Sequence, residues 1–201
     1  MRDPIILEKV KSTLAHLSQI APGRAIEVRI PPYAAIQCGE GPTHTRGTPP
    51  NVIEMDADGS HDPRDLHQIL EKIKDYDCVL GSRWVPGGKV INWPKSRQIL
   101  SQGGNIYARI MLGFKIGDST GGFRAYRSKA LKQIDLKEID SQGYCFQVDM
   151  VRRLLEKNLS IAEVPITFTE RTIGSSKMSK NIVIEAFLRI GLWGLKRLFK
   201  R

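Results

Sequence analysis

Cysteine is scarce in this sequence, and its three copies are far apart. Cys38, Cys78 and Cys145 form no C-x-x-C pair and no cluster with histidine. An odd number of widely spaced cysteines argues against both a disulfide framework and a zinc site. We therefore expect reduced thiols in a cytosolic setting.

Long hydrophobic runs are also missing. No apolar stretch approaches the ~20 residues that a membrane-spanning helix needs. The first residues, Met1 to Pro4, have none of the features of a secretory signal. Any contact with a membrane is therefore expected to be peripheral.

Acidic residues are outnumbered by basic ones. The 201 residues include 31 Lys and Arg against 21 Asp and Glu, which gives a net charge of +10. Such basicity predicts an anionic partner, which is a phosphate compound, an acidic membrane surface or a nucleic acid. The hydrophobic fraction of 41% is ordinary for a globular chain and sufficient for one domain with a core.

Two aspartates one residue apart follow a short apolar segment. Residues 51–55 predict a strand, and Asp56 and Asp58 stand at its C-terminal end. Ligands of open α/β sheets bind at that edge, and the hard cations Mg²⁺ and Mn²⁺ suit carboxylate oxygens shared with substrate phosphates. The aspartates alone leave two interpretations open, a metal–diphosphate site or a solvated acidic turn.

The next segments predict a βαβ unit. Asp62 and Pro63 are typical of a helix start, as N-cap and first helical residue. An apolar helix face follows, and residues 78–83 predict a second strand. A parallel crossover would bring Arg83 to the same sheet edge as the aspartates, which favours a site for a metal and an anion.

The remaining pattern predicts both helices and strands. Helices are expected at 5–19, 98–112, 129–134 and 144–157, and strands at 25–30, 123–127 and 161–168. Pro165 indicates an edge or a bulge in the last strand. Gly103 and Gly104, inside a helix, serve either close helix packing or the approach of the backbone to a ligand. Residues 31–50 contain five prolines and three glycines and predict a loop.

The C-terminal segment, residues 181–201, predicts an apolar and basic helix. Glu185 is its single acidic residue. A basic helix with Trp and Phe is typical of an interfacial anchor on anionic lipid. The alternative is a terminal helix that covers the core and ends in a solvated basic tail. A nucleic-acid interface is not expected, because the sequence has no stacking-aromatic motif.

Several short motifs then occur in a characteristic order. They are DADGSH at 56–61, GSRWVPGG at 81–88, NWP at 92–94, TGGFRAYR at 120–127, GYCFQ at 143–147, EVPITF at 163–168, and Arg171 followed by GSSKMS at 174–179. With these motifs the chain resembles, from about Val52 to its C-terminus, the polyprenol-phosphate (dolichol-phosphate) mannose synthases. These are family 2 glycosyltransferases of α/β GT-A fold, and the bacterial ones are the most similar.

The resemblance implies transfer of mannose from GDP-mannose to polyprenyl phosphate, with inversion and with Mg²⁺ or Mn²⁺. Asp56 and Asp58 would hold the metal, and Ser60 stands where family members often carry a glutamine, a further possible ligand. The acceptor phosphate monoester has a second pKa of about 6, so it is an anionic nucleophile at neutral pH and needs no general base. His61 and His67 are accordingly interpreted as a turn residue and a helix-face residue.

The resemblance also assigns residues to the two substrates. Arg171 and Lys177 would bind the donor diphosphate from a loop. Three other residues would receive the lipid phosphate, namely Arg83, Arg97 and Ser101. Two aspartates in family-like motifs are further candidates: Asp118, which would orient an arginine or a sugar hydroxyl, and Asp149.

The family's first elements have no counterpart in this sequence. Family members begin with a strand ending in Pro-x-Tyr-Asn-Glu and a second strand ending in paired aspartates, which form the nucleotide pocket. We therefore expect an N-terminally incomplete GT-A fold with doubtful activity of its own. Its expected divisions are a residual helix and strand at 1–30, an irregular segment at 31–50, a GT-A core at 51–180 and a membrane-interface helix at 181–201.

The expected location is the cytoplasmic face of a membrane. A membrane-anchoring partner subunit is a further expectation. Two alternatives to the mannose synthase remain. One is a polyprenyl-phosphate glycosyltransferase that uses another sugar nucleotide, such as UDP-glucose. The other is a nonenzymatic fragment that binds a lipid phosphate.

Overall fold

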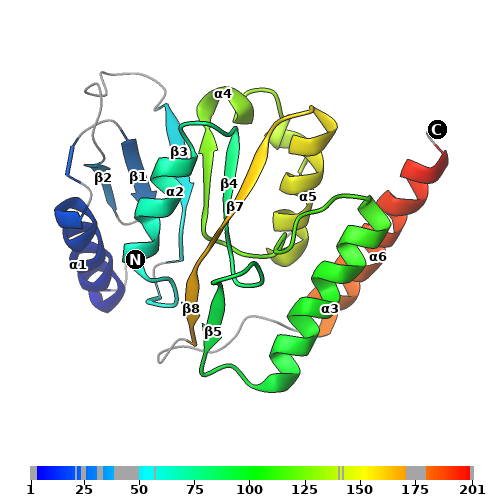
Figure 1. Cartoon of the computed structure of the whole chain (residues 1–201), viewed down its shortest axis with the longest axis horizontal. Coiled ribbons are helices and arrows are strands. Elements are labelled where there is room, and N and C mark those ends of the chain that lie inside the picture. The colour runs from blue at the N-terminus through cyan, green and yellow to red at the C-terminus, as the bar shows by residue number, and fades with distance from the viewer. Residues whose placement is uncertain are drawn as a thin grey trace.

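A mixed β-sheet forms the centre of the molecule (Figure 1). The computed structural model describes residues 4–20, 22–23, 26–30, 34–38, 50–56, 58–139, 141, 143–170 and 180–199. Within these residues the main sheet has six strands in the order β2-β1-β3-β6-β4-β7. Its strands are β1 (Ile26–Ile30), β2 (Ala34–Cys38), β3 (Asn51–Glu54), β4 (Cys78–Ser82), β6 (Arg124–Arg127) and β7 (Ile161–Pro165).

The predicted helices are present with small shifts of their ends. The helices are α1 (Pro4–Ile20), α2 (Leu66–Lys72), α3 (Lys95–Leu112), α4 (Ser128–Leu131), α5 (Gly143–Glu156) and α6 (Lys180–Phe199), with 3₁₀ turns η1 (Pro63–Asp65) and η2 (Leu136–Glu138). Asp62 caps η1 as predicted, because its side chain accepts a hydrogen bond from the Arg64 backbone N–H at 2.9 Å.

The pairing of the central strands corrects the predicted βαβ unit. Strands β3 and β4 are not neighbours, because β6 lies between them and is antiparallel to both. Ala125 of β6 pairs with Ile53 on one side and with Val79 on the other. Since both outer strands are antiparallel to β6, they still run in the same direction. The ends that carry Asp56 and Arg83 therefore remain at one edge of the sheet.

The predicted loop over residues 31–50 is wrong in part, because it contains strand β2. This strand pairs antiparallel with β1, and β1 in turn pairs parallel with β3. The ladder of backbone hydrogen bonds outweighs a proline-rich composition here, because the paired segment itself, Ala34–Cys38, contains no proline. The β2–β1 pair thus extends the sheet beyond β3.

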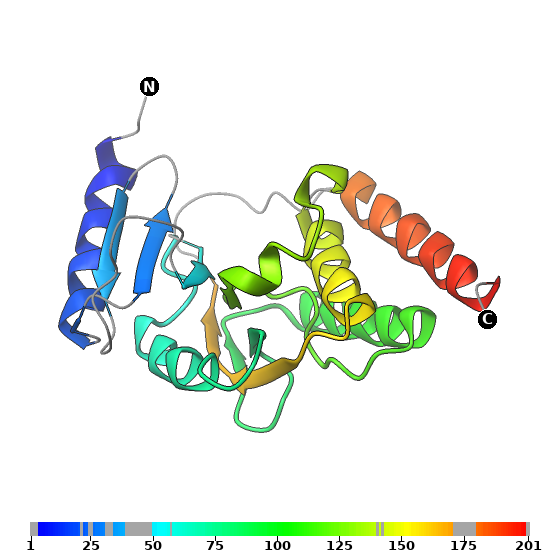
Figure 2. The ribbon, with the colours of Figure 1, turned by 90° about the horizontal axis from the view of Figure 1, so that it is seen from above.

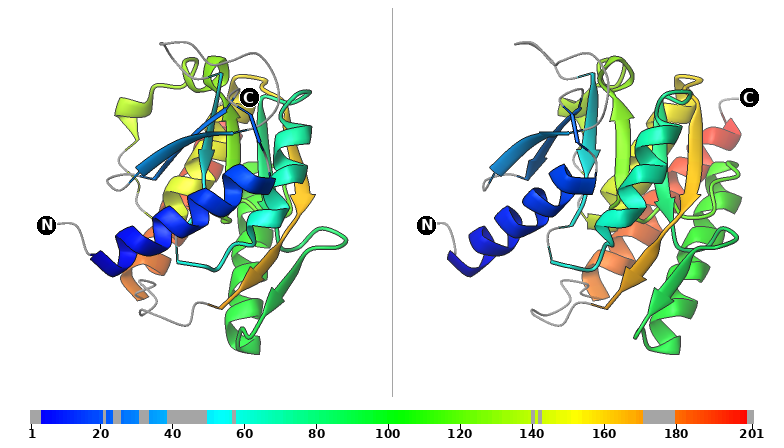
Figure 3. Two further views of the ribbon diagram at one scale, coloured as in Figure 1. Left: turned by 90° about the vertical axis from the view of Figure 1, so that its left-hand side faces the viewer. Right: turned by 60° about the vertical axis from the view of Figure 1, so that its left-hand side comes forward.

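Apolar side chains leave the sheet on both faces and form two cores. Successive residues of β4 alternate, so that Val79 packs with α1 and α2 while Cys78 and Leu80 pack with α4 and α5. Helices α1 and α2 share one face of the sheet (Figure 3). Helix α1 and the β1–β2 pair lie at the end of the molecule opposite α3 and α6 (Figure 2).

Strand β7 is an edge strand of the main sheet, in agreement with the prediction from Pro165. The chain leaves the sheet at this proline and continues as β8 (Thr167–Thr169), which pairs parallel with β5 (Lys89–Ile91). Strand β8 also contacts the segment after β3, because the Thr169 N–H donates a hydrogen bond to the Ser60 carbonyl at 2.9 Å. The second sheet therefore lies directly beside the two aspartates' loop.

Helices α3 and α6 form an outer layer against α5. Glycines let the two helices approach closely: a Cβ on Gly194 would lie 2.9 Å from the Met111 backbone oxygen. Arg197 of α6 donates to the same oxygen near the C-terminal end of α3. In the part of the chain that the structure describes, no helix is both long and apolar enough to cross a membrane.

Candidate functional site

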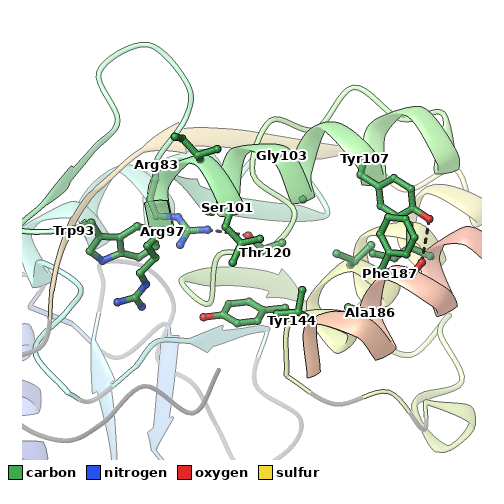
Figure 4. A pocket seen from close by; sticks show the side chains of 16 residues that line it. Arg83, Trp93, Arg97, Ser101, Gly103, Tyr107, Thr120, Tyr144, Ala186 and Phe187 are labelled. Carbon is green, nitrogen blue, oxygen red and sulfur yellow. Dashed lines mark hydrogen bonds between the residues drawn. The ribbon is translucent and has the colours of Figure 1, made fainter. Parts of the chain in front are cut away.

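An apolar pocket of about 420 Å³ lies between α3 and α6 (Figure 4). Its walls are mostly hydrocarbon and aromatic, from Ile99, Leu100, Tyr107, Val148, Phe187 and Ile190. The polar groups gather at one end, where Arg83, Ser101 and Thr120 lie together, with Arg97 and Trp93 beside them (Figure 4). All three residues predicted to receive the acceptor phosphate, Arg83, Arg97 and Ser101, therefore line one pocket.

Arg83 is held by a buried carboxylate. Its side chain is 4% exposed and that of Asp118 is 0% exposed. Both carboxylate oxygens accept from the guanidinium at 2.7 Å, and Thr120 Oγ1 accepts from Nη2 at 2.9 Å. Burial pushes the pKa of Asp118 upward, but the charge and hydrogen bonds of Arg83 outweigh burial and hold the pKa below its usual value. The pair is therefore ionised and its orientation is fixed.

Asn105 of α3 joins the helix to the loop that carries Asp118. Its Oδ1 accepts from the Ser119 backbone N–H at 2.8 Å, and its Nδ2 donates to Thr120 Oγ1 at 3.2 Å. It lies one turn after Ser101, whose carbonyl accepts from Nδ2 at 3.0 Å. We did not predict this residue, although a buried position for an amide on an amphipathic helix was the available signal.

Arg97 makes different contacts at the mouth of the same pocket. Its guanidinium lies over the Trp93 ring, 4.1 Å from the ring centroid, and forms an ion pair with Glu170 just after β8. The Arg97 Nε is buried and has no hydrogen-bond partner among the described residues. Glu170 was also missed from the sequence, where its only signal is its place next to Arg171.

The three predicted metal ligands, Asp56, Asp58 and Ser60, lie in a tight loop after β3. Asp58 Oδ1 accepts from the Ser60 backbone N–H at 3.0 Å and from Ser60 Oγ at 2.6 Å. His61 Nδ1 accepts from the Asp56 backbone N–H at 3.2 Å. Ser60 and His61 are buried, so their hydrogen bonds anchor the loop to the interior of the protein. The serine hydroxyl thus supports the Asp58 carboxylate, and its role as a metal ligand stays a prediction.

A glycine brings this loop next to the loop that carries Asp118. A Cβ on Gly122 would lie 3.4 Å from Asp56 Oδ2, which is van der Waals contact and shows how close the two loops lie. The charge of Asp56 also acts on Arg83, where it helps to keep the guanidinium protonated. The candidate metal loop and the candidate acceptor pocket therefore adjoin.

The donor set fits a hard divalent cation. Asp56 is exposed and Asp58 is half-buried, so both carboxylates are accessible. Mg²⁺ is commonly bound by one or two carboxylates together with water and substrate phosphates. Among the described residues no group of three or more His, Cys, Asp and Glu side chains converges. A cation at this loop would accordingly rely on Asp56, Asp58, water and a diphosphate.

The remaining predicted residues either lie away from the pocket or fall outside the described part of the chain. Arg171 and Lys177 lie outside the described residues. Asp149 is buried on α5, forms ion pairs with Arg152 and Arg153 of the same helix, and does not line the pocket. Its assignment as a further site residue gains no support from these contacts, which stabilise the helix.

The two glycines of α3 face open space and are not packed against another helix. A Cβ on Gly103 or Gly104 would meet nothing within 4 Å, and both residues line the pocket. The interpretation as close helix packing is therefore wrong. The backbone at these positions faces space that a ligand could use.

Comparison with known proteins identifies the class to which the chain belongs. Residues 35–135 match the model described as Glycosyl transferase family 2, so the chain is a member of this family. The match and the mixed α/β sheet confirm the predicted GT-A fold class. Residues 4–60 match a second model, described as Bacterial SCP ortholog. The predicted divisions at residues 30, 50 and 180 stay predictions.

Two curated relatives narrow the family. The undecaprenyl-phosphate mannosyltransferase of Micrococcus luteus is 54% identical over 144 residues, covering 72% of this chain and 59% of that protein. The polyprenol monophosphomannose synthase of Mycolicibacterium smegmatis is 49% identical over 146 residues, covering 72% and 55%. The resemblance to polyprenol-phosphate mannose synthases is thereby confirmed, and the matched region spans little more than half the length of these relatives.

A solved structure is similar at a greater distance. Glucosyl-3-phosphoglycerate synthase of Mycobacterium tuberculosis, crystallised with Mn²⁺ and UDP-glucose, has a TM-score of 0.46 and 13% identity. The similarity covers 75% of this chain and 50% of that chain. At this distance it supports no inference about ligands.

Proposed function

We propose that this chain forms the acceptor side of an enzyme that transfers mannose from GDP-mannose to polyprenyl (dolichyl) phosphate. The pocket between α3 and α6 carries the proposal, because it is apolar along its walls and cationic at one end. A polyprenyl phosphate has the same division into a long hydrocarbon chain and a charged head. The names of the two curated relatives support this substrate class.

In this mechanism the acceptor phosphate is the nucleophile. Its oxygen forms a bond to the anomeric carbon of the sugar while the bond from that carbon to the donor diphosphate breaks, with inversion. Arg83, fixed by Asp118, and the Ser101 hydroxyl would bind the phosphate beside the Asp56 loop. A base is unnecessary, because the phosphate monoester has a second pKa of about 6 and is largely dianionic at neutral pH.

The donor would lie on the side of the aspartates. Asp56 and Asp58 would hold Mg²⁺ or Mn²⁺, and such a cation stabilises the negative charge that develops on a leaving diphosphate. Arg171 and Lys177 are proposed to bind the same diphosphate. Because the Gly122 loop adjoins both Asp56 and Asp118, the two substrates would meet where these loops touch.

We also propose that the chain lies on the cytoplasmic face of a membrane, through α3 and α6. Large apolar side chains are exposed on both helices, at Ile99, Leu100, Ile106, Ile110, Ile184, Phe187, Leu188, Leu192, Leu195, Leu198 and Phe199. The pocket opens between these helices, which gives a hydrocarbon chain a short path from a bilayer to Arg83. A membrane-anchoring partner subunit is compatible with this surface and stays a prediction.

A nonenzymatic lipid-phosphate binder is the second candidate, and one observation favours it. The strand beside β3 on the side away from β6 is β1, which lies in the segment that matches the Bacterial SCP ortholog model and outside residues 35–135, which match the glycosyltransferase model. A related enzyme that uses UDP-glucose is the third candidate. The acceptor pocket fits all three candidate functions, so they are distinguished by which donor, if any, the chain uses.

One assay separates the three candidates. The chain is incubated with Mn²⁺, farnesyl phosphate and radiolabelled GDP-mannose or UDP-glucose, and label in the lipid phase is counted. We expect label from GDP-mannose and a loss of it in Asp58→Ala. Label from UDP-glucose alone supports the other donor. Binding of farnesyl phosphate without transfer from either donor supports the nonenzymatic binder, and absence of both binding and transfer contradicts the proposed function.

A further inference from the structure

The second arginine of the pocket is already paired with a carboxylate of the chain. Arg97 forms an ion pair with Glu170, and the two side chains are 16% and 26% exposed. The aromatic face of Trp93 holds the guanidinium from the other side. Glu170 therefore occupies an anion-binding position at the mouth of the acceptor pocket.

The two arginine–carboxylate pairs of the pocket are built differently. Asp118 is wholly buried and also accepts hydrogen bonds from the Arg83 backbone N–H and the Thr120 hydroxyl. Glu170 is partly exposed, and among the described residues Arg97 is the one side chain that bonds to its carboxylate. The Asp118 pair is therefore held by more hydrogen bonds and is shielded from water, while the Glu170 pair has fewer bonds and access to water.

Only the side chain of Glu170 needs to move for this pair to open. Its backbone N–H donates to the Ile91 carbonyl at 2.9 Å, which extends the pairing of β8 with β5. The Arg97 Nε meanwhile is a buried donor without an acceptor among the described residues. A phosphate oxygen entering the pocket would supply this acceptor and would compete with Glu170 for the same guanidinium.

Electrostatic repulsion determines whether Glu170 can stay paired with Arg97 when a phosphate binds. If Glu170 remained on Arg97, the arginine would present no net positive charge, and the carboxylate would repel a phosphate dianion twice as strongly as a monoanion. Screening by salt is weaker for a partly buried pair such as this one. A bound dianion is therefore compatible with a free Arg97 and not with the paired one.

We propose that Glu170 is an internal competitor for the acceptor phosphate: it neutralises Arg97 while the pocket is empty and is displaced when the phosphate of the lipid binds. This inference rests on the proposed acceptor function of the pocket. Glu170 thus lowers the affinity of the site for lipid phosphates, which favours release of a bound phosphate, and it keeps a half-buried guanidinium paired between turnovers.

The test measures binding of farnesyl phosphate to the whole chain by quenching of tryptophan fluorescence, to which Trp93 in the pocket contributes. Glu170→Gln keeps the shape of the side chain and removes its charge. We expect it to lower the Kd about tenfold, which corresponds to about 1.4 kcal/mol. Glu71→Gln removes an exposed carboxylate of α2 that pairs with Lys74, and as the matched control it is expected to leave the Kd nearly unchanged.

A double substitution ties the effect to Arg97. In an Arg97→Gln background Glu170→Gln should give little or no gain, because no guanidinium is released. Glu170→Ala repeats the test without the amide, and thermal unfolding checks that each variant is folded. Unchanged or weaker binding by both Glu170 variants contradicts the competitor role alone. If neither the wild type nor any variant binds farnesyl phosphate, the acceptor function of the pocket fails with it.

Discussion

Buried polar side chains hold the cationic end of the pocket in place. Arg124 of β6 is fully buried and donates to the carbonyls of Ser119 and Gly121, while Asn105 binds the same loop from α3. A buried donor or acceptor that loses its partner destabilises a protein by about 1–3 kcal/mol, and a buried charge by more. A network in which these members are satisfied therefore allows Arg83 essentially one orientation.

His61 makes a residue-scale prediction about pH. The imidazole lies between Phe123 and Phe168, and burial lowers its pKa to about 4. Unfolded chains bind a proton at this histidine below about pH 6.5, whereas the folded chain resists it down to about pH 4. We expect the free energy of unfolding to fall by up to about 3 kcal/mol between pH 6.5 and 4, and this contribution to level off below.

Urea unfolding of the wild type and of His61→Gln at a series of pH values measures this contribution. The variant should have a shallower slope in that window, because glutamine does not titrate. His67→Gln, which removes an exposed histidine from α2, is the matched control and should keep the wild-type slope. Equal slopes for wild type and His61→Gln would show that the histidine is accessible to protons in the folded chain.

At the residue scale, the sequence predicts a residue's role only when that role does not depend on a partner far away in the chain. Arg83, Arg97 and Ser101 were grouped by the resemblance to the mannose synthases, and the structure places them in one pocket. Asn105 and Glu170 could not be predicted, because their roles depend on partners far away in the sequence, Ser119 and Arg97. A polar residue inside an apolar pattern signals such a partner but does not identify it.

At the scale of elements, glycines in two helices serve opposite purposes. Gly103 of α3 faces open space, since a Cβ there would meet nothing within 4 Å. Gly194 of α6 lies against α3, where a Cβ would be 2.8 Å from Met111 Cε and 2.9 Å from the Met111 backbone oxygen. One glycine therefore leaves space in front of α3, and the other lets α6 pack on it.

The same substitution at these two positions should change stability in opposite directions. Gly103→Ala is expected to stabilise by about 0.5–1 kcal/mol, because alanine loses less backbone entropy in a helix. Gly194→Ala should destabilise by about 1–3 kcal/mol, because the backbone oxygen that its methyl group would meet cannot move aside. Urea unfolding followed by circular dichroism measures both. Equal stabilisation by the two variants would mean that α6 does not pack on α3 in this way.

Element types were easier to predict than element pairing. Apolar periodicity identified α1, α3, α5 and α6, because one face of each helix repeats with the turn. The insertion of β6 between β3 and β4 could not be read from the sequence, because its partners precede it by more than 40 residues and the period of a strand is the same in either direction. Strand β2 was missed because prolines and glycines surround it.

At the scale of the whole molecule, apolar exposure and net charge point to the same partner. Helices α3 and α6, which carry exposed apolar side chains, lie beside each other at one end of the molecule (Figures 1 and 2). Lys196 and Arg197 occupy the last turn of α6, and the chain carries a net charge of +10. Apolar burial and attraction to anionic headgroups then act together, which favours an anionic bilayer over a neutral one.

A single carboxylate on this surface should weaken membrane binding. Leu192 is exposed on α6 and does not line the pocket. Leu192→Glu removes an apolar side chain worth about 1.5–3 kcal/mol when buried and places a charge against the lipid. We expect at least about a tenfold loss of binding to anionic phospholipid vesicles, measured by cosedimentation.

Ile5→Glu makes the same change in charge on the exposed face of α1 and should bind like the wild type. If both variants lose binding equally, net charge and not the α3–α6 surface determines the membrane affinity. If neither loses it, the exposed apolar side chains face something other than lipid.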